Sequence, residues 1–120
     1  MIQNEKDLLL KDLCSRIPYG VKISIDDDIQ TVIGQILYND DYVVTDKGCY
    51  SLKNVVIKPY LFPLNKISGD MWSEYLATCV GGNASFPTLK SFDWCNKHHI
   101  DYRGLIPKGL ANDATGLNIY

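Results

Sequence analysis

The sequence lacks any long hydrophobic run. Its apolar stretches, such as Leu8–Leu10 and Val55–Ile57, are far shorter than the roughly 20 residues that a membrane-spanning helix needs. The opening segment, Met1–Asp7, carries acidic residues where a secretory signal peptide has a basic start. These two absences predict a cytoplasmic protein without a membrane-spanning segment.

An excess of one sign of charge is also missing. The chain has 12 lysine and arginine residues against 14 aspartate and glutamate residues, a net charge of −2. Proteins that bind nucleic acids or anionic membranes usually carry a basic excess. The most acidic local run, Asp26–Asp28, has neither the spaced ligands nor the glycine of a calcium loop, so we interpret it as a solvated turn.

Closely spaced cysteine pairs are absent as well. The four cysteines are Cys14, Cys49, Cys79 and Cys95. An even number would suit the disulfide framework of a secreted protein, but each cysteine lies inside an apolar pattern and no secretion signal is visible. We therefore predict free, buried thiols.

What the chain does have is enough apolar content to fold without disulfide bonds or a structural metal ion. It has 120 residues, of which 46% are hydrophobic and 22% are charged, as in ordinary globular domains. We predict one α+β domain over residues 1–120. Its parts are an N-terminal helix in 1–20, a small β-barrel in 21–64 and a helical part in 65–120.

Helical periodicity marks the first segment. The pattern predicts a helix from Asn4, as a candidate N-cap, to Arg16. Charged residues, Asp12 among them, are expected on the solvent side. The apolar stripe at four-residue spacing consists of Leu9, Leu10, Leu13 and Cys14.

An alternating pattern replaces the helical one at Val21, which predicts a half-buried strand with Val21, Ile23 and Ile25 on its inner side. Gly34 indicates a bulge in the next strand, and Pro59 favours an edge position or a strand end in the last one. The further predicted strands cover Thr31–Tyr38, Tyr42–Thr45, Cys49–Ser51 and Asn54–Leu61.

Tight turns separate these strands. They are expected at Asp26–Asp28, at Asn39–Asp40 and at Asp46–Gly48, where Gly48 would supply a left-handed residue. Connections this short require antiparallel pairing, because parallel strands need a long crossover. We therefore predict a small, curled antiparallel sheet of the SH3-like barrel kind.

Two helices are predicted after the sheet. The first has Ser68 or Asp70 as its cap and ends at Gly81–Asn83. Its expected apolar face consists of Met71, Trp72, Tyr75, Leu76 and Cys79. The second is announced by Ser85, Pro87 and Thr88 and runs to about His99, and its expected buried side consists of Leu89, Phe92 and Cys95, with Trp94 off that stripe.

Cys95, His98 and His99 raise the questions of a metal site and of a nucleophile. Structural zinc normally has four nitrogen or sulfur ligands, and only half of such a set is present here. Catalysis would need a base within reach of an activated thiol, whereas Cys95 lies on a predicted apolar stripe, where thiols are usually inert. We favour neither chemistry, and predict no metal, no cofactor and no catalytic residue.

Basic and aromatic residues gather toward the C-terminal part. The candidate binding residues are Trp94, Lys97, His98, His99, Tyr102 and Arg103. With Lys90 and Lys108 they could form a nucleic-acid surface, because aromatic rings stack on bases and cations neutralise phosphates. However, Asp93, Asp101 and Asp113 lie among them and leave little net charge there.

Three stretches carry a resemblance to a known group of proteins. They are Asp12–Gly20, Val56–Leu64 with its IKPYL motif, and Phe92–Ile106 with its DYRGLI motif. Together they resemble a family of small uncharacterised proteins of prophages and mobile elements of gut anaerobes. Where that family often has Arg-Pro after the first motif, this chain has Phe62 and Pro63. The resemblance implies phage association and an intracellular setting, and it assigns no activity.

The sequence thus leaves two functions in view. The first is a non-enzymatic module that binds a host or phage protein; the eight tyrosines favour it, because tyrosine combines an apolar body with a polar tip. The second is a nucleic-acid-binding accessory protein that uses the basic-aromatic C-terminal residues. No small-molecule substrate is inferred.

Overall fold

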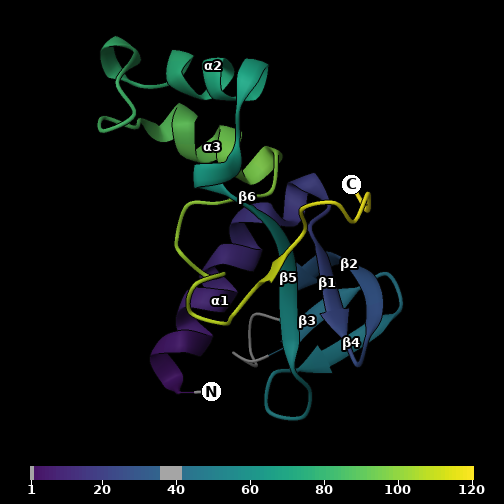
Figure 1. The fold of residues 1–120 in the computed structure, drawn as a ribbon. Coiled ribbons are helices and arrows are strands. Elements are labelled where there is room, and N and C mark those ends of the chain that lie inside the picture. Colours follow the sequence, from purple (N-terminus) through teal and green to yellow (C-terminus); the bar gives the residue numbers. More distant parts are fainter. Residues whose placement is uncertain (1, 36–41) are drawn as a thin grey trace.

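The computed structural model describes residues 2–35 and 42–120. After an N-terminal helix the chain forms most of a sheet, passes through two further helices and returns to the sheet (Figure 1). None of the helices in these ranges is long and apolar enough to span a bilayer. The elements, with η for a 3-10 helix, are α1 (Gln3–Arg16), η1 (Ile17–Tyr19), β1 (Lys22–Ile25), β2 (Asp28–Gln35), β3 (Tyr42–Thr45), β4 (Gly48–Ser51), β5 (Ile57–Pro63), η2 (Leu64–Lys66), α2 (Gly69–Ala77), η3 (Val80–Gly82), α3 (Leu89–Lys97), β6 (Ile100–Asp101) and β7 (Asn112–Asp113).

The strands form one seven-stranded sheet. Its order is β4-β3-β2-β1-β5-β6, and β7 also pairs with β5. The pairs among β1 to β5 are antiparallel, whereas β6 and β7 run parallel to β5. The segment that contains α2 and α3 supplies the long crossover that the parallel β5–β6 pair requires.

The α+β class is confirmed, but two finer predictions about the sheet are wrong. Within the described residues the outer strands β4 and β6 do not pair with each other, so the sheet stays open and no SH3-like barrel forms. The sheet is also not wholly antiparallel. β6 and β7 have two residues each, too few for an alternating pattern to reveal them in the sequence.

The first hydrophobic core lies between α1 and the sheet. Val21, Ile23 and Ile25 are almost wholly buried, as the alternation predicts, and they pack together with Leu9 and Leu13 of α1. Burial of each such side chain stabilises the fold by about 1.5–3 kcal/mol. This core fixes α1 on one face of the sheet (Figure 1).

The predicted helix is confirmed, but three details of it are wrong. α1 begins at Gln3 with Ile2 as its N-cap, so Asn4 does not cap it. Cys14 is exposed, because the neighbouring Leu13 already faces the core. Asp12, expected at the surface, is fully buried.

Gly34 lies at a bulge, and Pro59 lies where β5 is locally an edge, as the sequence predicts. The β2–β3 register shifts between Val32 and Gly34, where the bulge was predicted. Pro59 lies in β5 opposite Ile23 of β1. β7 and β6 join β5 only from Tyr60 onward, so the missing N–H of Pro59 lies in a part of the strand that is locally an edge.

The two hairpin turns that fall on described residues differ in their backbone. Asp26 and Asp27 both have positive φ, 49° and 66°, as the tight turn of a two-residue hairpin requires, and Asp28 already opens β2. Gly48 does not have a left-handed φ; it opens β4 instead, which corrects the prediction. The predicted turn at Asn39–Asp40 and the end of the strand predicted to Tyr38 lie outside the described residues.

A second, smaller core holds the helical arm (residues 64–99) together. Tyr75 and Cys79 from α2 and its end pack with Cys95 of α3 and Ile100 of β6. The Thr88 and Ser91 side chains form a capping box at the start of α3, close to the predicted start. The helical arm rises from one end of the sheet (Figure 1).

The predicted buried stripe of α3 is wrong apart from Cys95. Leu89 is 86% exposed and Phe92 is 39% exposed. The inward face carries Ser91 instead, whose hydroxyl bonds to the Thr78 carbonyl oxygen at 3.0 Å and to the Thr88 N–H at 2.9 Å. A small polar side chain with its hydrogen bonds satisfied can be buried at little cost, and this choice turns the larger apolar residues outward.

Candidate functional site

The candidate binding residues divide between two places. Lys97, His98 and His99 line a pocket of about 520 Å³ beside the end of β5. Tyr102 and Arg103 line a groove of about 570 Å³ between α1 and α3. The predicted group is therefore not one continuous surface.

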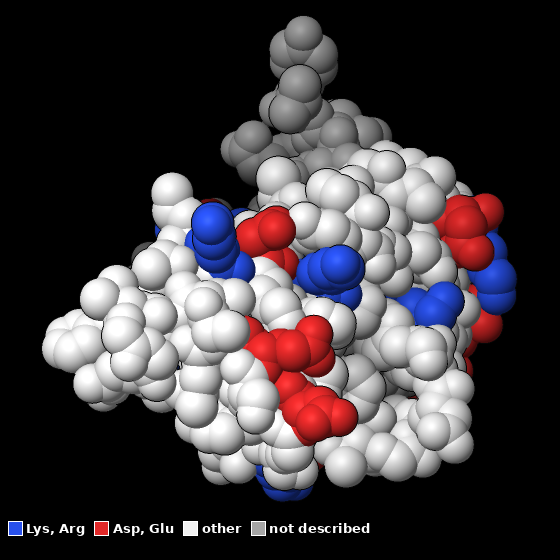
Figure 2. Space-filling model, turned by 90° about the horizontal axis from the view of Figure 1, so that it is seen from above, with Lys and Arg blue, Asp and Glu red and all other residues white. Residues whose placement is uncertain are grey.

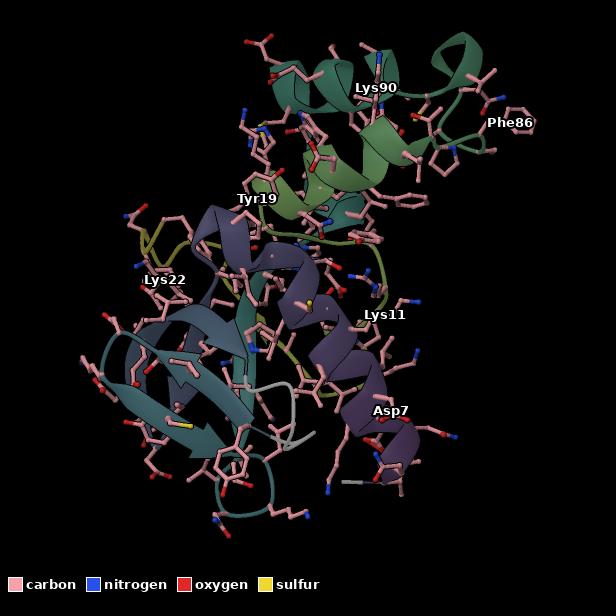
Figure 3. The ribbon with its side chains drawn as sticks, turned by 180° about the vertical axis from the view of Figure 1, so that it is seen from behind. Asp7, Lys11, Tyr19, Lys22, Phe86 and Lys90 are labelled. Atoms are coloured by element: carbon pink, nitrogen blue, oxygen red, sulfur yellow. The ribbon has the colours of Figure 1, made fainter. Side chains whose placement is uncertain are left out.

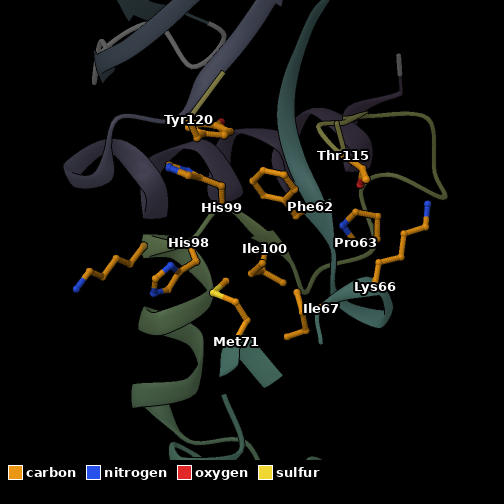
Figure 4. A pocket seen from close by; sticks show the side chains of 11 residues that line it. Phe62, Pro63, Lys66, Ile67, Met71, His98, His99, Ile100, Thr115 and Tyr120 are labelled. Carbon is orange, nitrogen blue, oxygen red and sulfur yellow. The ribbon is translucent and has the colours of Figure 1, made fainter. Parts of the chain in front are cut away.

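We call the first place the histidine pocket and the second the α1–α3 groove. The histidine pocket is lined by Phe62, Pro63, Lys66, Ile67, Met71, Lys97, His98, His99, Ile100, Thr115 and Tyr120 (Figure 4). The α1–α3 groove is lined by Lys11, Ser15, Leu89, Phe92, Asp93, Asn96, Tyr102 and Arg103.

Trp94 belongs to the second core and lines neither place. Its ring centroid lies 4.5 Å from that of His98 and 5.7 Å from that of Tyr75. Its indole nitrogen is buried and has no hydrogen-bond partner in the part of the chain that the structure describes. Trp94 therefore packs against the His98 ring. It was expected off the buried stripe, and it is half-buried against the second core.

A buried ion-pair network, which the sequence analysis missed, joins the two cores. The Asp12 carboxylate accepts bonds from Arg16 Nε at 2.8 Å and from Arg16 Nη2 at 3.0 Å. Both residues are 0% exposed. The same guanidinium also donates to the carbonyl oxygens of Cys95 and Ile100, at 3.3 and 2.7 Å. Arg16 thus links α1 to α3 and β6.

Arg103 is the third member of this network and is not a free cation. Its Nη1 donates to Asp12 Oδ1 at 2.8 Å and its Nη2 to Ser15 Oγ at 3.1 Å. The guanidinium also lies over the Tyr102 ring, 4.6 Å from the centroid. These contacts hold the segment after β6 on α1, which makes Arg103 a structural residue first.

His99 has the most unusual environment of the candidate residues. Its backbone is left-handed, with φ of 60°, and its side chain stacks on Tyr120 with ring centroids 3.7 Å apart. Burial, followed by the positive charges of Arg16, His98 and Lys22, lowers the pKa of His99 to about 4. The imidazole is therefore neutral at pH 7.

Tyr120, which follows β7 in the chain, holds the His99 ring in place. The hydroxyl of Tyr120 accepts the N–H of Lys22 at 2.9 Å and donates to the carbonyl oxygen of Tyr60 at 2.7 Å. It therefore bridges β1 and β5 just beyond the pair of Ile23 with Pro59. Burial raises the pKa of this phenol to about 12, so it remains a hydrogen-bond donor.

The four cysteines are not all buried, and Cys95 is not in a reactive environment. Cys79 and Cys95 are buried, but Cys14 and Cys49 are exposed, which corrects the prediction of four buried thiols. Burial raises the pKa of Cys95 to about 12, so the thiol is protonated at pH 7 and weakly nucleophilic. Among the described residues no group of three or more His, Cys, Asp or Glu side chains could hold a metal ion.

Charge on the face of the molecule drawn in Figure 2 is mixed. Figure 2 shows basic and acidic side chains next to one another on the face seen from above, with uncharged surface between them. In the α1–α3 groove, the Asp93 carboxylate accepts a hydrogen bond from the Tyr19 hydroxyl, and this contact raises the pKa of Tyr19. Neither the face in Figure 2 nor the α1–α3 groove resembles the continuous basic surface that a phosphate backbone needs.

Comparisons with known proteins do not assign the chain to a group. No protein family, curated protein or solved structure matches it. The resemblance to a prophage-borne family therefore stays a prediction. The pocket and the groove are the features of the molecule from which a function can be inferred.

Proposed function

We propose that this protein is a non-enzymatic binding module and that the α1–α3 groove receives a segment of another protein. The observation that carries the proposal is the exposure of Leu89, a large apolar residue that is 86% exposed in the first turn of α3. Phe92, one turn further along, is 39% exposed and lies beside Tyr102. Clustered apolar exposure of this kind is typical of interaction surfaces.

Further apolar side chains extend this surface beyond the groove. Phe86 and Val80 are 58% and 61% exposed, and the backbone N–H of Val80 bonds to the carbonyl oxygen of Phe86. Figure 3 shows Phe86 projecting from the far end of the helical arm, on the same side of the view as Lys11 of α1. A bound segment would thus run from α1 along α3 toward Phe86.

The charged side chains of the α1–α3 groove determine which kind of apolar segment it favours. In the described part of the chain the Lys11 side chain has no ion-pair or hydrogen-bond partner, and it lines the groove opposite Leu89 and Phe92. The one acidic side chain in that lining, Asp93, is engaged by Tyr19. The groove therefore favours a segment that carries a large apolar side chain next to a carboxylate.

The resemblance noted in the sequence directs the search for the source of that segment. We expect a phage or host protein that is met in the cytoplasm. The nucleic-acid function has less support, because Arg103 is already paired with Asp12 and Lys97 belongs to a different place from Tyr102.

A peptide-display selection with the whole protein as bait tests the proposal. We expect enriched peptides in which Asp or Glu adjoins a large apolar residue. Leu89→Asp will weaken their binding at least tenfold. The variant loses the burial of Leu89 against the peptide, about 1.5–3 kcal/mol, and its new carboxylate repels the acidic residue of the peptide. Fluorescence anisotropy of a labelled peptide measures the dissociation constant.

The matched control is Val56→Asp, which places the same charge at a residue that is 64% exposed and far from the groove in the sequence and the fold. It should leave the affinity unchanged. Selections without enrichment, or equal losses in the two variants, would contradict the proposal. Salt-sensitive binding of single- or double-stranded DNA or RNA that Leu89→Asp does not alter would favour the nucleic-acid function instead.

A further inference from the structure

The histidine pocket has the size and lining of a small-molecule site. Its volume of about 520 Å³ lies within the range of roughly 300–1,000 Å³ that such sites occupy. Figure 4 shows the apolar side chains of Phe62, Ile67, Met71 and Ile100 in its middle, with His98 and His99 on one side and Lys66 on the other. An apolar centre with polar groups at the sides suits an amphipathic ligand.

The charged side chains of this lining have one sign. Among the described residues, Lys66 and Lys97 line the pocket and no aspartate or glutamate does. The Lys66 ammonium group forms an ion pair with Asp113, with 3.2 Å between Nζ and Oδ2. The Lys97 side chain has no partner in the described part of the chain. Positive charge beside low-dielectric walls attracts an anion.

His99 provides a second and independent indication of a ligand. It is 7% exposed and lines the pocket, and within residues 2–35 and 42–120 its buried Nδ1 has no hydrogen-bond partner. A buried imidazole with no partner at either ring nitrogen is rare in folded proteins and calls for an explanation. Its left-handed backbone, φ of 60°, is a strained conformation of the kind that gathers at functional sites.

The imidazole is also held ready for a hydrogen bond. Among the described residues Nε2 has no hydrogen-bond partner, and unlike Nδ1 it is not one of the fully buried atoms. A neutral ring with its proton on Nε2 leaves only a lone pair in the sealed position and presents an N–H donor. The stack on Tyr120, at 3.7 Å and 12° between ring planes, fixes the orientation of that donor.

We propose that the histidine pocket binds a small aromatic carboxylate. The flat body of the ligand would lie among Phe62, Met71 and Ile100, while its carboxylate would accept the His99 Nε2–H and face the ammonium group of Lys97. The site is separate from the α1–α3 groove, so it stands or falls independently of the proposed function.

Titration with 2-naphthoate, followed by NMR chemical shifts of the methyl groups and of the histidine rings, tests the proposal. We expect saturable shifts at Met71, Ile100 and His99, with a dissociation constant below about 1 mM for a ligand of this size. The neutral 2-naphthamide should bind about tenfold more weakly. Lys97→Gln, at an exposed residue whose loss leaves the core intact, should weaken 2-naphthoate about three- to tenfold.

The matched control is Lys90→Gln, which removes an exposed lysine of the same helix that does not line the pocket. It should leave the affinity unchanged. Equal binding of the acid and the amide would overturn the proposed anion site, as would an equal loss in the Lys90 and Lys97 variants. Absence of saturable shifts at the pocket residues would overturn the site altogether. Decanoate binding tighter than 2-naphthoate would replace the aromatic ligand by an aliphatic one and so refute the stated class.

Discussion

Replacing Asp12 by alanine will lower the free energy of unfolding by about 3–5 kcal/mol. The Asp12 carboxylate lies between the guanidinium groups of Arg16 and Arg103, each with a nitrogen 2.8 Å from one of its oxygens. Among the described residues, its removal leaves the fully buried Arg16 guanidinium with only the carbonyl oxygens of Cys95 and Ile100 as hydrogen-bond acceptors. Urea unfolding at pH 7, followed by tryptophan fluorescence, measures the change.

Two further variants make this result interpretable. Asp7→Ala removes an exposed carboxylate from the same helix and should change the free energy of unfolding by no more than about 0.5 kcal/mol. Asp12→Asn keeps the shape of the side chain and one acceptor oxygen, so this variant should be destabilised less than Asp12→Ala. Its free energy of unfolding can still be measured if the alanine variant does not fold. Equal stability of the Asp7 and Asp12 alanine variants would show that the network does not hold the cores together.

Acid will destabilise the fold through His99. The pKa of its imidazole is about 4 in the folded chain and about 6.5 when unfolded, because burial and then Arg16, His98 and Lys22 disfavour its charged form. As the pH falls from 7 to 4, the unfolded chain takes up a proton that the folded chain does not. The free energy of unfolding therefore falls over that window, by about 2–3 kcal/mol, and the loss levels off below pH 4.

Urea titrations at pH 7, 6, 5 and 4 measure this dependence against His99→Asn. Asparagine tolerates a left-handed backbone and does not titrate, so the variant should lose the slope between pH 6.5 and 4. Asp28 and Asp113, whose pKa values are lowered mainly by hydrogen bonds from Lys47 and Thr115 respectively, are present in both proteins. Parallel pH profiles for the two proteins would exclude His99 as the titrating group.

The Asp12–Arg16 network shows how a candidate feature can be visible in the sequence and still be misread. Leu9, Asp12, Leu13 and Arg16 stand at positions i, i+3, i+4 and i+7, which is one face of a helix. That spacing was the available signal. The charge of Asp12 suggested solvent, because a buried charge is tolerated only when a partner compensates for it. The compensating groups come from Arg103, Cys95 and Ile100, which are distant in sequence.

Most of the candidate binding residues lie on two concave surfaces, and their binding role stays a prediction. Lys97, His98 and His99 do converge on a pocket, and Tyr102 and Arg103 do line a groove. What the sequence could not indicate is that these are two different places, because the chain turns sharply at the left-handed His99 between them. Lys11, Leu89 and Phe92 were missed as groove residues, since the apolar pattern assigned the last two to the core.

Local sequence determined four features: periodicity gave α1 and the inner side of β1, and single residue types gave the bulge at Gly34 and the start of α3 near Thr88. These features depend on residues within a few positions of one another, so their pattern is readable in the sequence. Tertiary structure decided that Ser91 and not Leu89 faces inward, that β6 and β7 join β5 in parallel, and that Tyr120 stacks on His99. Each of these depends on burial or hydrogen bonds supplied by a distant segment, and such partners exist only once the chain has folded.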